Sequence, residues 1–296
     1  MAEPSVVRHR MLQDTPWPTE ASPLRRETWS GIAQAYATYT SPLRPSQDDL
    51  EIVQRAVNEW RIERPDHPMS VISLGVTPDI AALHWPSGSK LLALDSSMTV
   101  IRALWPGNIR PRRWAACGNW LSIPCRQRSC DIVVGDGSLN AFRYPHGIRA
   151  ALTAIRDVLA EHGTLIIRCY VRADQAETGE EVLNDLLGNR IRDINHFKFR
   201  LFVALQRSAE TGSPVSDIYR FLRERISRDV LLSMPGWSQD AVNGIELWRD
   251  ADTVYTFPTL AEFRAVFGEL FCERSAEFPS YTLGENCPTL LLTARD

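Results

Sequence analysis

Between residues 69 and 171, short apolar runs alternate with segments that carry apolar residues at helical spacing. The runs are VISLGV, LLALD, WAACG, DIVVGD and TLIIRCYV. Runs of this kind, rich in Val, Ile and Leu, are typical of strands buried on both faces of a parallel sheet. The segments between them are helical or long enough to cross over. The pattern predicts an α/β fold, a Rossmann-like, doubly wound and mostly parallel sheet.

Helical periodicity precedes and interrupts these runs. Residues 47–64 follow Ser46, a favourable N-cap, and they carry acids in the first turn and apolar residues on one face. A shorter helix is expected in residues 27–39, where apolar residues recur every three or four positions. The segment 146–163 repeats the same spacing up to Gly163, which is expected to end a third helix.

The second half of the chain departs from the strand–helix alternation. Residues 172–250 contain long, polar, helix-like segments, which predict an α-helical insertion. The segment TLAEFRAVFGELF then predicts a helix, and ERSAEFPSY and PTLLLTAR predict two strands that add an antiparallel C-terminal edge. We therefore expect an N-terminal helical lead or cap in 1–68, an α/β domain in 69–171 and 251–296, and an insertion in 172–250.

Composition excludes several classes of protein. Apolar residues make up 44% and charged residues 23% of the 296, as in globular chains. The net charge of −3 gives no sign of a nucleic-acid partner, and no apolar stretch approaches the ~20 residues that span a bilayer, so no membrane partner is expected. The six cysteines form no CxxC pair, which favours reduced thiols over disulfides or a metal site. Without a signal-peptide pattern, a cytoplasmic location is expected.

Two residues at predicted strand ends point to a nucleoside ligand. Gly75 closes the first apolar run, where a bend and the close approach of a ligand are both expected. Asp95 closes the second run, where a carboxylate can accept hydrogen bonds from ribose hydroxyls. A dinucleotide GxGxxG motif would need glycine at Thr77 and Ile80, and no phosphate-binding P-loop motif occurs. A ligand with a ribose and no phosphates is favoured, although an ordinary turn glycine remains the alternative for Gly75.

The order of these motifs resembles the class I S-adenosylmethionine (SAM)-dependent methyltransferases. The resemblance runs from about Trp29 to Tyr170, through VISLGV, LALDSS, CGNWLSIP, DIVVGDGSLN and IRDVLAEHGTLIIR. TVYTFPTLAEF and the final predicted strand are also similar to that family's C-terminal end. It implies the fold predicted above, SAM as the cofactor, and methyl transfer that yields S-adenosylhomocysteine (SAH).

The resemblance also implies a cofactor site at the carboxyl ends of the strands. Gly75 would face the methionine part of SAM, Asp95 the ribose and Asn119 the adenine edge, while Asp136 would lie near the sulfonium. For Trp120, packing in the core is an equal alternative. The full implied set is Tyr36, Gly75, Val76, Thr77, Asp95, Ser96, Ser97, Asn119, Trp120, Asp136, Gly137 and Ser138.

Two features depart from the family pattern. The family's first motif usually carries two or three glycines after an acid, whereas this chain has Gly75 alone and then Asp79, a negative charge near the expected methionine carboxylate. Asn119 stands where the family often has Asp, and its amide can still meet an adenine edge with a donor and an acceptor.

A general base is needed only if the acceptor's nucleophile is protonated. The candidates for a catalytic group are Asp136, Asn140, His146 and Tyr170, with a structural role as the alternative for each. Tyr36 and Tyr39 join them if the N-terminal helix folds over the site.

The leading hypothesis is a SAM-dependent methyltransferase whose N-terminal helices and insertion cover the site and select a small-molecule acceptor. One alternative is a SAM enzyme of different chemistry, such as intramolecular displacement or aminocarboxypropyl transfer giving methylthioadenosine. Another is a non-catalytic partner protein with the same fold. No feature of the insertion favours one acceptor, one methylated atom or one oligomeric state.

Overall fold

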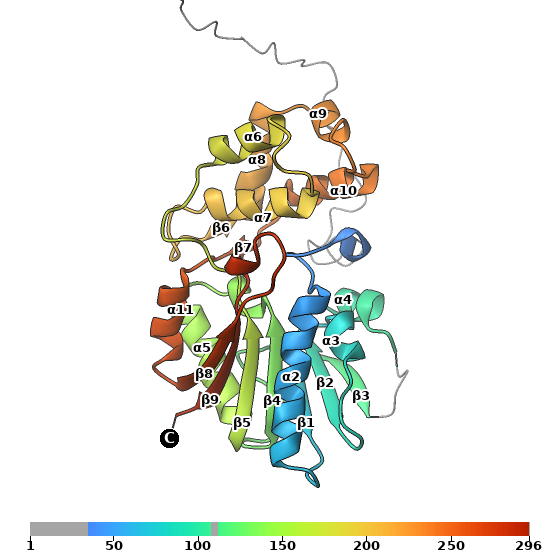
Figure 1. Cartoon of the computed structure of the whole chain (residues 1–296), viewed down its shortest axis with the longest axis vertical. Coiled ribbons are helices and arrows are strands. Elements are labelled where there is room, and N and C mark those ends of the chain that lie inside the picture. Colours follow the sequence, from blue (N-terminus) through green and yellow to red (C-terminus); the bar gives the residue numbers. More distant parts are fainter. Residues whose placement is uncertain (1–34, 108–111, 296) are drawn as a thin grey trace, which may run out of the picture.

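A single sheet of seven strands forms the centre of the molecule in a computed structural model that describes residues 35–107 and 112–295 (Figure 1). The sheet runs in the order β3-β2-β1-β4-β5-β9-β8. Its strands are β1 (Ser70–Leu74), β2 (Lys90–Asp95), β3 (Arg113–Cys117), β4 (Cys130–Asp136), β5 (Leu159–Arg168), β8 (Phe271–Glu277) and β9 (Thr289–Ala294). Each apolar run noted in the sequence thus becomes one strand of this sheet.

Strand direction confirms the predicted fold class. Neighbouring strands from β3 to β5 are parallel, whereas β9 is antiparallel to both β5 and β8. The predicted antiparallel C-terminal strand is therefore present, one place in from the edge formed by β8. Leu74 pairs with Leu94 on one side and with Gly135 on the other. This register brings the carboxyl ends of β1, β2 and β4 level at one edge of the sheet.

Helices cover both faces of the sheet. One face carries α2 (Gln47–Glu63), α3 (Pro78–Ala82) and α4 (Met98–Leu104), and the other carries α5 (His146–Val158) and α11 (Leu260–Phe267). The predicted N-cap of α2 is confirmed: Ser46 accepts a hydrogen bond from the Asp49 backbone, and the Asp49 side chain accepts one from the Ser46 backbone. Strands with helices on both faces have no exposed face, which explains their continuous apolar runs.

Two predicted helices differ at their ends. Of the helix expected in residues 27–39, positions before 35 lie outside the described residues, and Tyr36–Thr38 form a short 3₁₀ turn, η2. The expectation that Gly163 ends the third helix is wrong, because α5 ends at Val158 and β5 begins at Leu159. Leu159 already pairs with Cys130 of β4, and a Cβ atom at Gly163 would lie 2.9 Å from the Cys130 carbonyl oxygen. Gly163 thus permits close strand pairing.

The segment between β5 and α11 forms a helical layer above the carboxyl ends of the strands (Figure 1). It contains α6 (Gly179–Leu187), α7 (Ile194–Ala204), α8 (Val215–Arg225), α9 (Arg228–Leu232), α10 (Gln239–Asn243) and the 3₁₀ helix η4 (Gly244–Trp248). Two short strands, β6 (Ser213–Pro214) and β7 (Val254–Tyr255), pair beside them.

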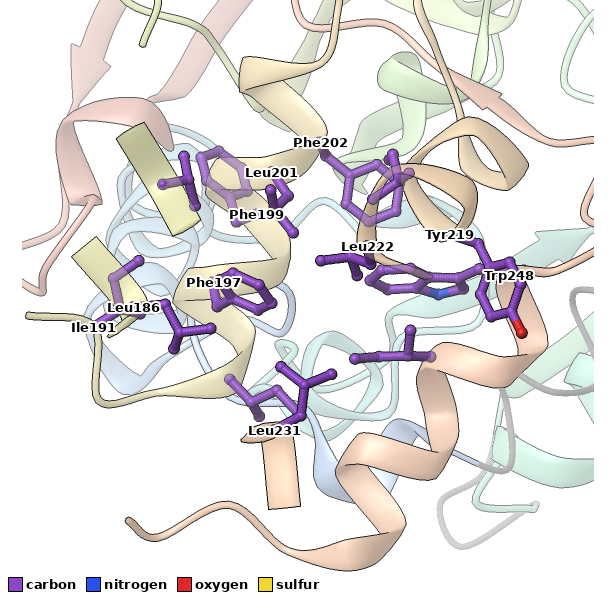
Figure 2. Close-up of a cluster of buried hydrophobic side chains, with 14 of the residues drawn as sticks. Leu186, Ile191, Phe197, Phe199, Leu201, Phe202, Tyr219, Leu222, Leu231 and Trp248 are labelled. Carbon is purple, nitrogen blue, oxygen red and sulfur yellow. The ribbon is translucent and has the colours of Figure 1, made fainter. Parts of the chain in front are cut away.

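This layer has a hydrophobic core of its own (Figure 2). Its central helix is α7, in which eight of the 11 residues are buried, including Phe197, Phe199 and Phe202. Phe202 packs edge-to-face on Trp248 of η4 at a ring-centroid distance of 5.1 Å. The aromatic side chains of α7 therefore join the layer together, and Phe199 also contacts Tyr170, two residues beyond the end of β5. No helix in the described part of the chain combines the length and apolarity of a membrane span.

Candidate functional site

A cavity lies between the carboxyl ends of the strands and the helical layer. Its sheet side is lined by residues at or just after the ends of β1, β2, β4 and β5, and its cover side by η2, α7, η4 and β7. The predicted residues that line it are Tyr36, Gly75, Val76, Thr77, Asp95, Trp120, Asp136, Gly137, Ser138 and Tyr170. The tertiary structure thus gathers most of the predicted set around one cavity, from the ends of five strands, β1 to β5, and from the N-terminal segment.

Gly75 and Trp120 form one wall of this cavity. Gly75 has φ +99°, a backbone conformation that other residues rarely adopt, so the strand end requires glycine here. The Trp120 ring lies against it, since a Cβ atom at Gly75 would be 3.5 Å from Trp120 Cζ2. The Gly75 backbone N–H and Trp120 Nε1 both donate to the Leu94 carbonyl, each at 2.7 Å. Trp120 is therefore packed against the sheet and lines the cavity as well.

Among the described residues, the Asp95 carboxylate has few hydrogen-bond partners. Its Oδ1 accepts a hydrogen bond from the Ser97 backbone N–H at 2.9 Å, and its Oδ2 accepts a long one from the Val76 N–H at 3.4 Å. Burial raises the pKa of Asp95, and these two hydrogen bonds oppose the shift. A carboxylate with unused lone pairs at a cavity wall is suited to accept hydrogen bonds from a pair of ligand hydroxyls.

Three predicted cofactor residues do not line the cavity. The Ser97 hydroxyl accepts a hydrogen bond from the Val100 backbone and caps α4. Asn119 turns its side-chain oxygen to the Leu121 N–H at 2.9 Å, in an exposed turn. Ser96 lies between the end of β2 and this cap, outside the lining. Side chains that satisfy nearby backbone groups in this way are directed by local turn geometry.

Asp136 belongs to a buried ion-pair cluster. The Arg168 guanidinium contacts Asp136 Oδ1 at 2.5 Å and Asp49 Oδ2 at 3.0 Å, with side-chain exposures of 3%, 8% and 2% for Arg168, Asp136 and Asp49. Arg168 also donates to the Tyr281 and Tyr170 hydroxyls and to the Pro42 carbonyl. Burial raises the pKa of Asp136 and Arg168 opposes that shift. The cluster contains two carboxylates for one guanidinium, so its net charge is negative when all three groups are ionised.

Tyr170 lies beside this cluster with its ring against Gly137. Gly137 has φ +60°, and a Cβ atom there would be 2.4 Å from Tyr170 Cε2, so glycine is required for both the turn and the ring. Burial raises the pKa of Tyr170 well above its usual range. The phenol therefore stays protonated at neutral pH, where it can donate a hydrogen bond to a ligand but is a poor general base.

The structure does not bring Asn140 and His146 to the cavity. Asn140 is fully buried: its Nδ2 donates to the Tyr170 and Thr256 carbonyls at 2.7 and 2.6 Å, and its Oδ1 accepts from the Tyr170 N–H at 3.0 Å. These hydrogen bonds brace the backbone just after β5, at Tyr170, and just after β7, at Thr256. His146 is the first residue of α5 and contacts Arg149 at the surface. Of the four catalytic candidates, Asp136 and Tyr170 line the cavity.

No family model matches the chain, and no curated protein does. Solved structures do match its fold. The CcbJ methyltransferase from Streptomyces caelestis is 12% identical, with a TM-score of 0.54 over 91% of this chain and 99% of that one. The CurJ carbon methyltransferase is also 12% identical, with a TM-score of 0.52 over 90% of this chain and 58% of that one. A Rhodobacter sphaeroides protein named as a zinc-dependent alcohol dehydrogenase is 13% identical, with a TM-score of 0.61 over 93% and 100%.

The strand order with its single antiparallel strand β9, together with these likenesses, decides the fold. The chain has the class I SAM-dependent methyltransferase fold. Within residues 35–107 and 112–295, no group of three or more His, Cys, Asp and Glu side chains is arranged to hold a metal ion.

Asp79, in the first turn of α3 after β1, is the acid that departs from the family's sequence pattern. The Arg44 guanidinium binds both oxygens of Asp79, at 2.9 and 2.7 Å, and the Tyr36 hydroxyl donates to Asp79 at 2.8 Å. Burial acts to raise the pKa of Asp79, but the hydrogen bonds from Arg44 and Tyr36 outweigh it and leave the pKa lowered. The charge that departs from the family's sequence pattern is thus neutralised by a partner from the N-terminal segment.

Sequence reasoning missed three charged residues of this methyltransferase fold. Arg168 and Asp49 form the buried cluster with Asp136, and Lys198 of α7 lines the cavity from the cover side. A signal existed for each basic residue, because Arg168 interrupts the apolar run TLIIRCYV and Lys198 stands between phenylalanines in FKF. A charged residue within an apolar segment is almost never fully buried unless it is paired or functional.

Proposed function

We propose that this chain is a SAM-dependent methyltransferase acting on a small-molecule acceptor. The observation that carries the proposal is the cavity between Gly75, Asp95 and Asp136 at three strand ends and the aromatic side chains of the helical layer. In open α/β sheets, ligands bind outside the carboxyl ends of the strands, where this cavity lies.

The cavity wall supports the fit of the ribose and the amino-acid end of SAM. Asp95, with unused lone pairs, would accept hydrogen bonds from the ribose hydroxyls, and the bare backbone of Gly75 allows the ligand to approach closely. The amino-acid end would meet Tyr36 and Thr77, next to the neutralised Asp79–Arg44 pair. A protonated amino group and a carboxylate are complementary to an acid–guanidinium pair of this kind.

The reactive centre would lie between Asp136 and Tyr170. SAM supplies a methyl group on a sulfonium, and in the transfer the C–S bonding electrons remain on sulfur while the acceptor bonds to the methyl carbon. The negative Asp136–Arg168–Asp49 cluster favours a cationic ligand at that position. The Tyr170 hydroxyl would orient the acceptor by donating a hydrogen bond, and the helical layer would exclude water and hold the acceptor in line. Residues 172–250 would thus act as a substrate cap, completed by the N-terminal segment.

Calorimetry with the full chain tests the proposal directly. SAH should bind the wild type, and Asp95→Ala should weaken binding about 10- to 100-fold, since hydrogen bonds to a charged group are worth about 1.5–3 kcal/mol. Asp66→Ala, a change at an exposed loop position, is the matched control and should bind normally. If the wild type bound neither SAH nor SAM at millimolar concentration, the proposal would be wrong.

Mass spectrometry after incubation with SAM separates methyl transfer from the other SAM chemistries. Methyl transfer predicts SAH only when an acceptor is present. Release of methylthioadenosine without an acceptor would replace methyl transfer by intramolecular displacement.

A further inference from the structure

We propose that the cover half of the cavity binds a planar aromatic molecule bearing an anionic oxygen, a carboxylate or phenolate, which Lys198 Nζ holds. That this molecule is the methyl acceptor rests on the proposed function. The site itself rests on three features of the cavity: an aromatic wall, one buried ammonium group, and the placement of both lining carboxylates on the opposite side.

The aromatic wall comes from four separate parts of the chain. Its members are Tyr39, Phe199, Phe202, Trp248, Tyr255 and Phe257. Phe202 is in edge-to-face contact with Trp248 at 5.1 Å and with Tyr255 at 5.7 Å, and Phe199 with Phe257 at 6.0 Å. Rings that fix one another in this way form a rigid, largely apolar lining, which favours a flat aromatic ligand.

Lys198 is the one cation among the described residues that line this cavity, and it lies on the cover side. Its side chain is 2% exposed, and Nζ donates to the Ala241 carbonyl at 3.0 Å. Tyr39 and Trp248 stand around it, with ring centroids 5.7 and 5.8 Å from Nζ. An ammonium has three N–H donors, and among the described residues the Ala241 carbonyl takes one of them.

No carboxylate in the described part of the chain forms an ion pair with Lys198. Asp193, at the start of the same helix, is occupied by the Asn195 and His196 backbone and by the Thr40 hydroxyl. Asp95 and Asp136, the two acids of the lining, lie at the strand ends on the sheet side. Burying a charge without a partner costs free energy, and an anionic ligand would supply the missing partner.

The environment of Lys198 already shows this cost. Burial lowers the pKa of Lys198 to about 8, and the distant Asp193 offsets only part of the shift. An anionic oxygen within hydrogen-bond distance of Nζ would favour the charged amine and restore its pKa. The same oxygen would find no other cation in the lining. Aromatic stacking and one charge-assisted hydrogen bond would then orient the ligand with its opposite edge toward the sheet side.

A matched pair of probes tests the site with the full-length protein. 2-Naphthoate carries the ring system and the anion, and 2-naphthylmethanol carries the same ring system without charge. Binding is measured by quenching of tryptophan fluorescence, with Trp248 in the wall as a reporter. Naphthoate should bind the wild type about tenfold or more tighter than the alcohol, as expected for a charge-assisted contact in a dry pocket.

The variant Lys198→Met should remove this preference and leave binding of the alcohol unchanged, because Met keeps the apolar stem and loses the charge. Lys90→Met, at the other lysine of the chain, should retain the preference. Equal affinity of the wild type for the two probes, or an undiminished preference in Lys198→Met, would overturn the inference. The comparison of probes in the wild type decides the matter even if Lys198→Met does not fold.

A parallel titration with SAH distinguishes the two proposals. Loss of the naphthoate preference with normal SAH binding would leave the cofactor site standing and remove this acceptor class. A clear naphthoate preference without SAH binding would keep the anion site and remove the methyltransferase.

Discussion

The two sides of the cavity differ in how their charges are paired. On the sheet side, Asp136 and Asp79 each contact an arginine, Arg168 or Arg44. On the cover side, Lys198 has a backbone carbonyl and two aromatic rings around its ammonium. The acids of the sheet-side ion pairs are therefore held by arginines before a ligand arrives, whereas the cover-side ammonium has no carboxylate partner among the described residues. Under the proposed function, the strand ends would hold SAM and the helical layer would select the acceptor.

The strongest test of the sheet side is Arg168→Met. It leaves Asp136 and Asp49 buried without their guanidinium, and breaking a buried pair costs about 3–5 kcal/mol of unfolding free energy. Urea denaturation measures the loss. Arg55→Met removes an exposed pair with Glu277 and should cost less than about 1 kcal/mol. If both variants lost the same amount, Arg168 would not hold the two buried acids as described above.

The pH dependence of stability tests the unpaired charge of the cover side. Burial lowers the pKa of Lys198 from its usual 10.5 to about 8 in the folded chain, so between these values the unfolded chain binds more protons. Stability therefore carries a penalty below pH 8 that is relieved as the pH rises toward 10.5. At about 1.4 kcal/mol per pKa unit, the relief is about 3 kcal/mol.

Lys198→Met should lack this component, so denaturation of wild type and variant at pH 7.5 and 10 isolates it from other titrating groups. A constant difference in stability between the two proteins at both pH values would contradict an uncompensated buried amine.

Comparing Gly137→Ala with Gly88→Ala tests whether the Tyr170 ring on the sheet side is held rigidly. Both Gly137 and Gly88 have positive φ, but a Cβ atom at Gly137 would collide with the Tyr170 ring, whereas nothing lies within 4 Å at Gly88. Gly88→Ala should cost the backbone strain alone, about 1–2 kcal/mol. Gly137→Ala should cost about 1–3 kcal/mol more because of the overpacked ring. Thermal unfolding of the two variants gives the difference, and equal costs would mean that Tyr170 is free to move.

The smallest expected loss of stability is at Ser46, which supports Asp49 of the Asp136–Arg168–Asp49 cluster. Ser46→Ala removes the cap of α2 and the hydroxyl that supports Asp49, which should cost about 1 kcal/mol. Chemical denaturation against Ser87→Ala, an exposed serine, measures it. A change of SAH affinity larger than the change of stability would show that Asp49 acts on the cofactor site beyond its part in folding.

Local sequence patterns were enough to predict the sheet and part of the candidate site. Five apolar runs became five neighbouring strands, and parallel strands end at one edge, so Gly75, Asp95 and Asp136 had to meet there. Asn140 and His146 also follow β4 in the chain, but they do not reach the cavity. The Asn140 side chain binds backbone groups, and the His146 side chain lies at the surface. The direction of the Asn140 side chain depends on its contacts with Tyr170 and Thr256, 30 and 116 positions away, which no local pattern contains.

By itself, the sequence determined the element types, the fold class and the strand ends at which a nucleoside-like ligand would bind, because periodicity and turn residues act over a few neighbouring positions. Only the tertiary structure decided which charges are paired. Arg168 meets Asp49 across 119 positions of the chain, and Arg44 meets Asp79 across 35. Lys198 faces the cavity because the packing of its two phenylalanine neighbours sets the rotation of α7. Successive helical residues point about 100° apart, so this rotation had to be known before Lys198 could be placed.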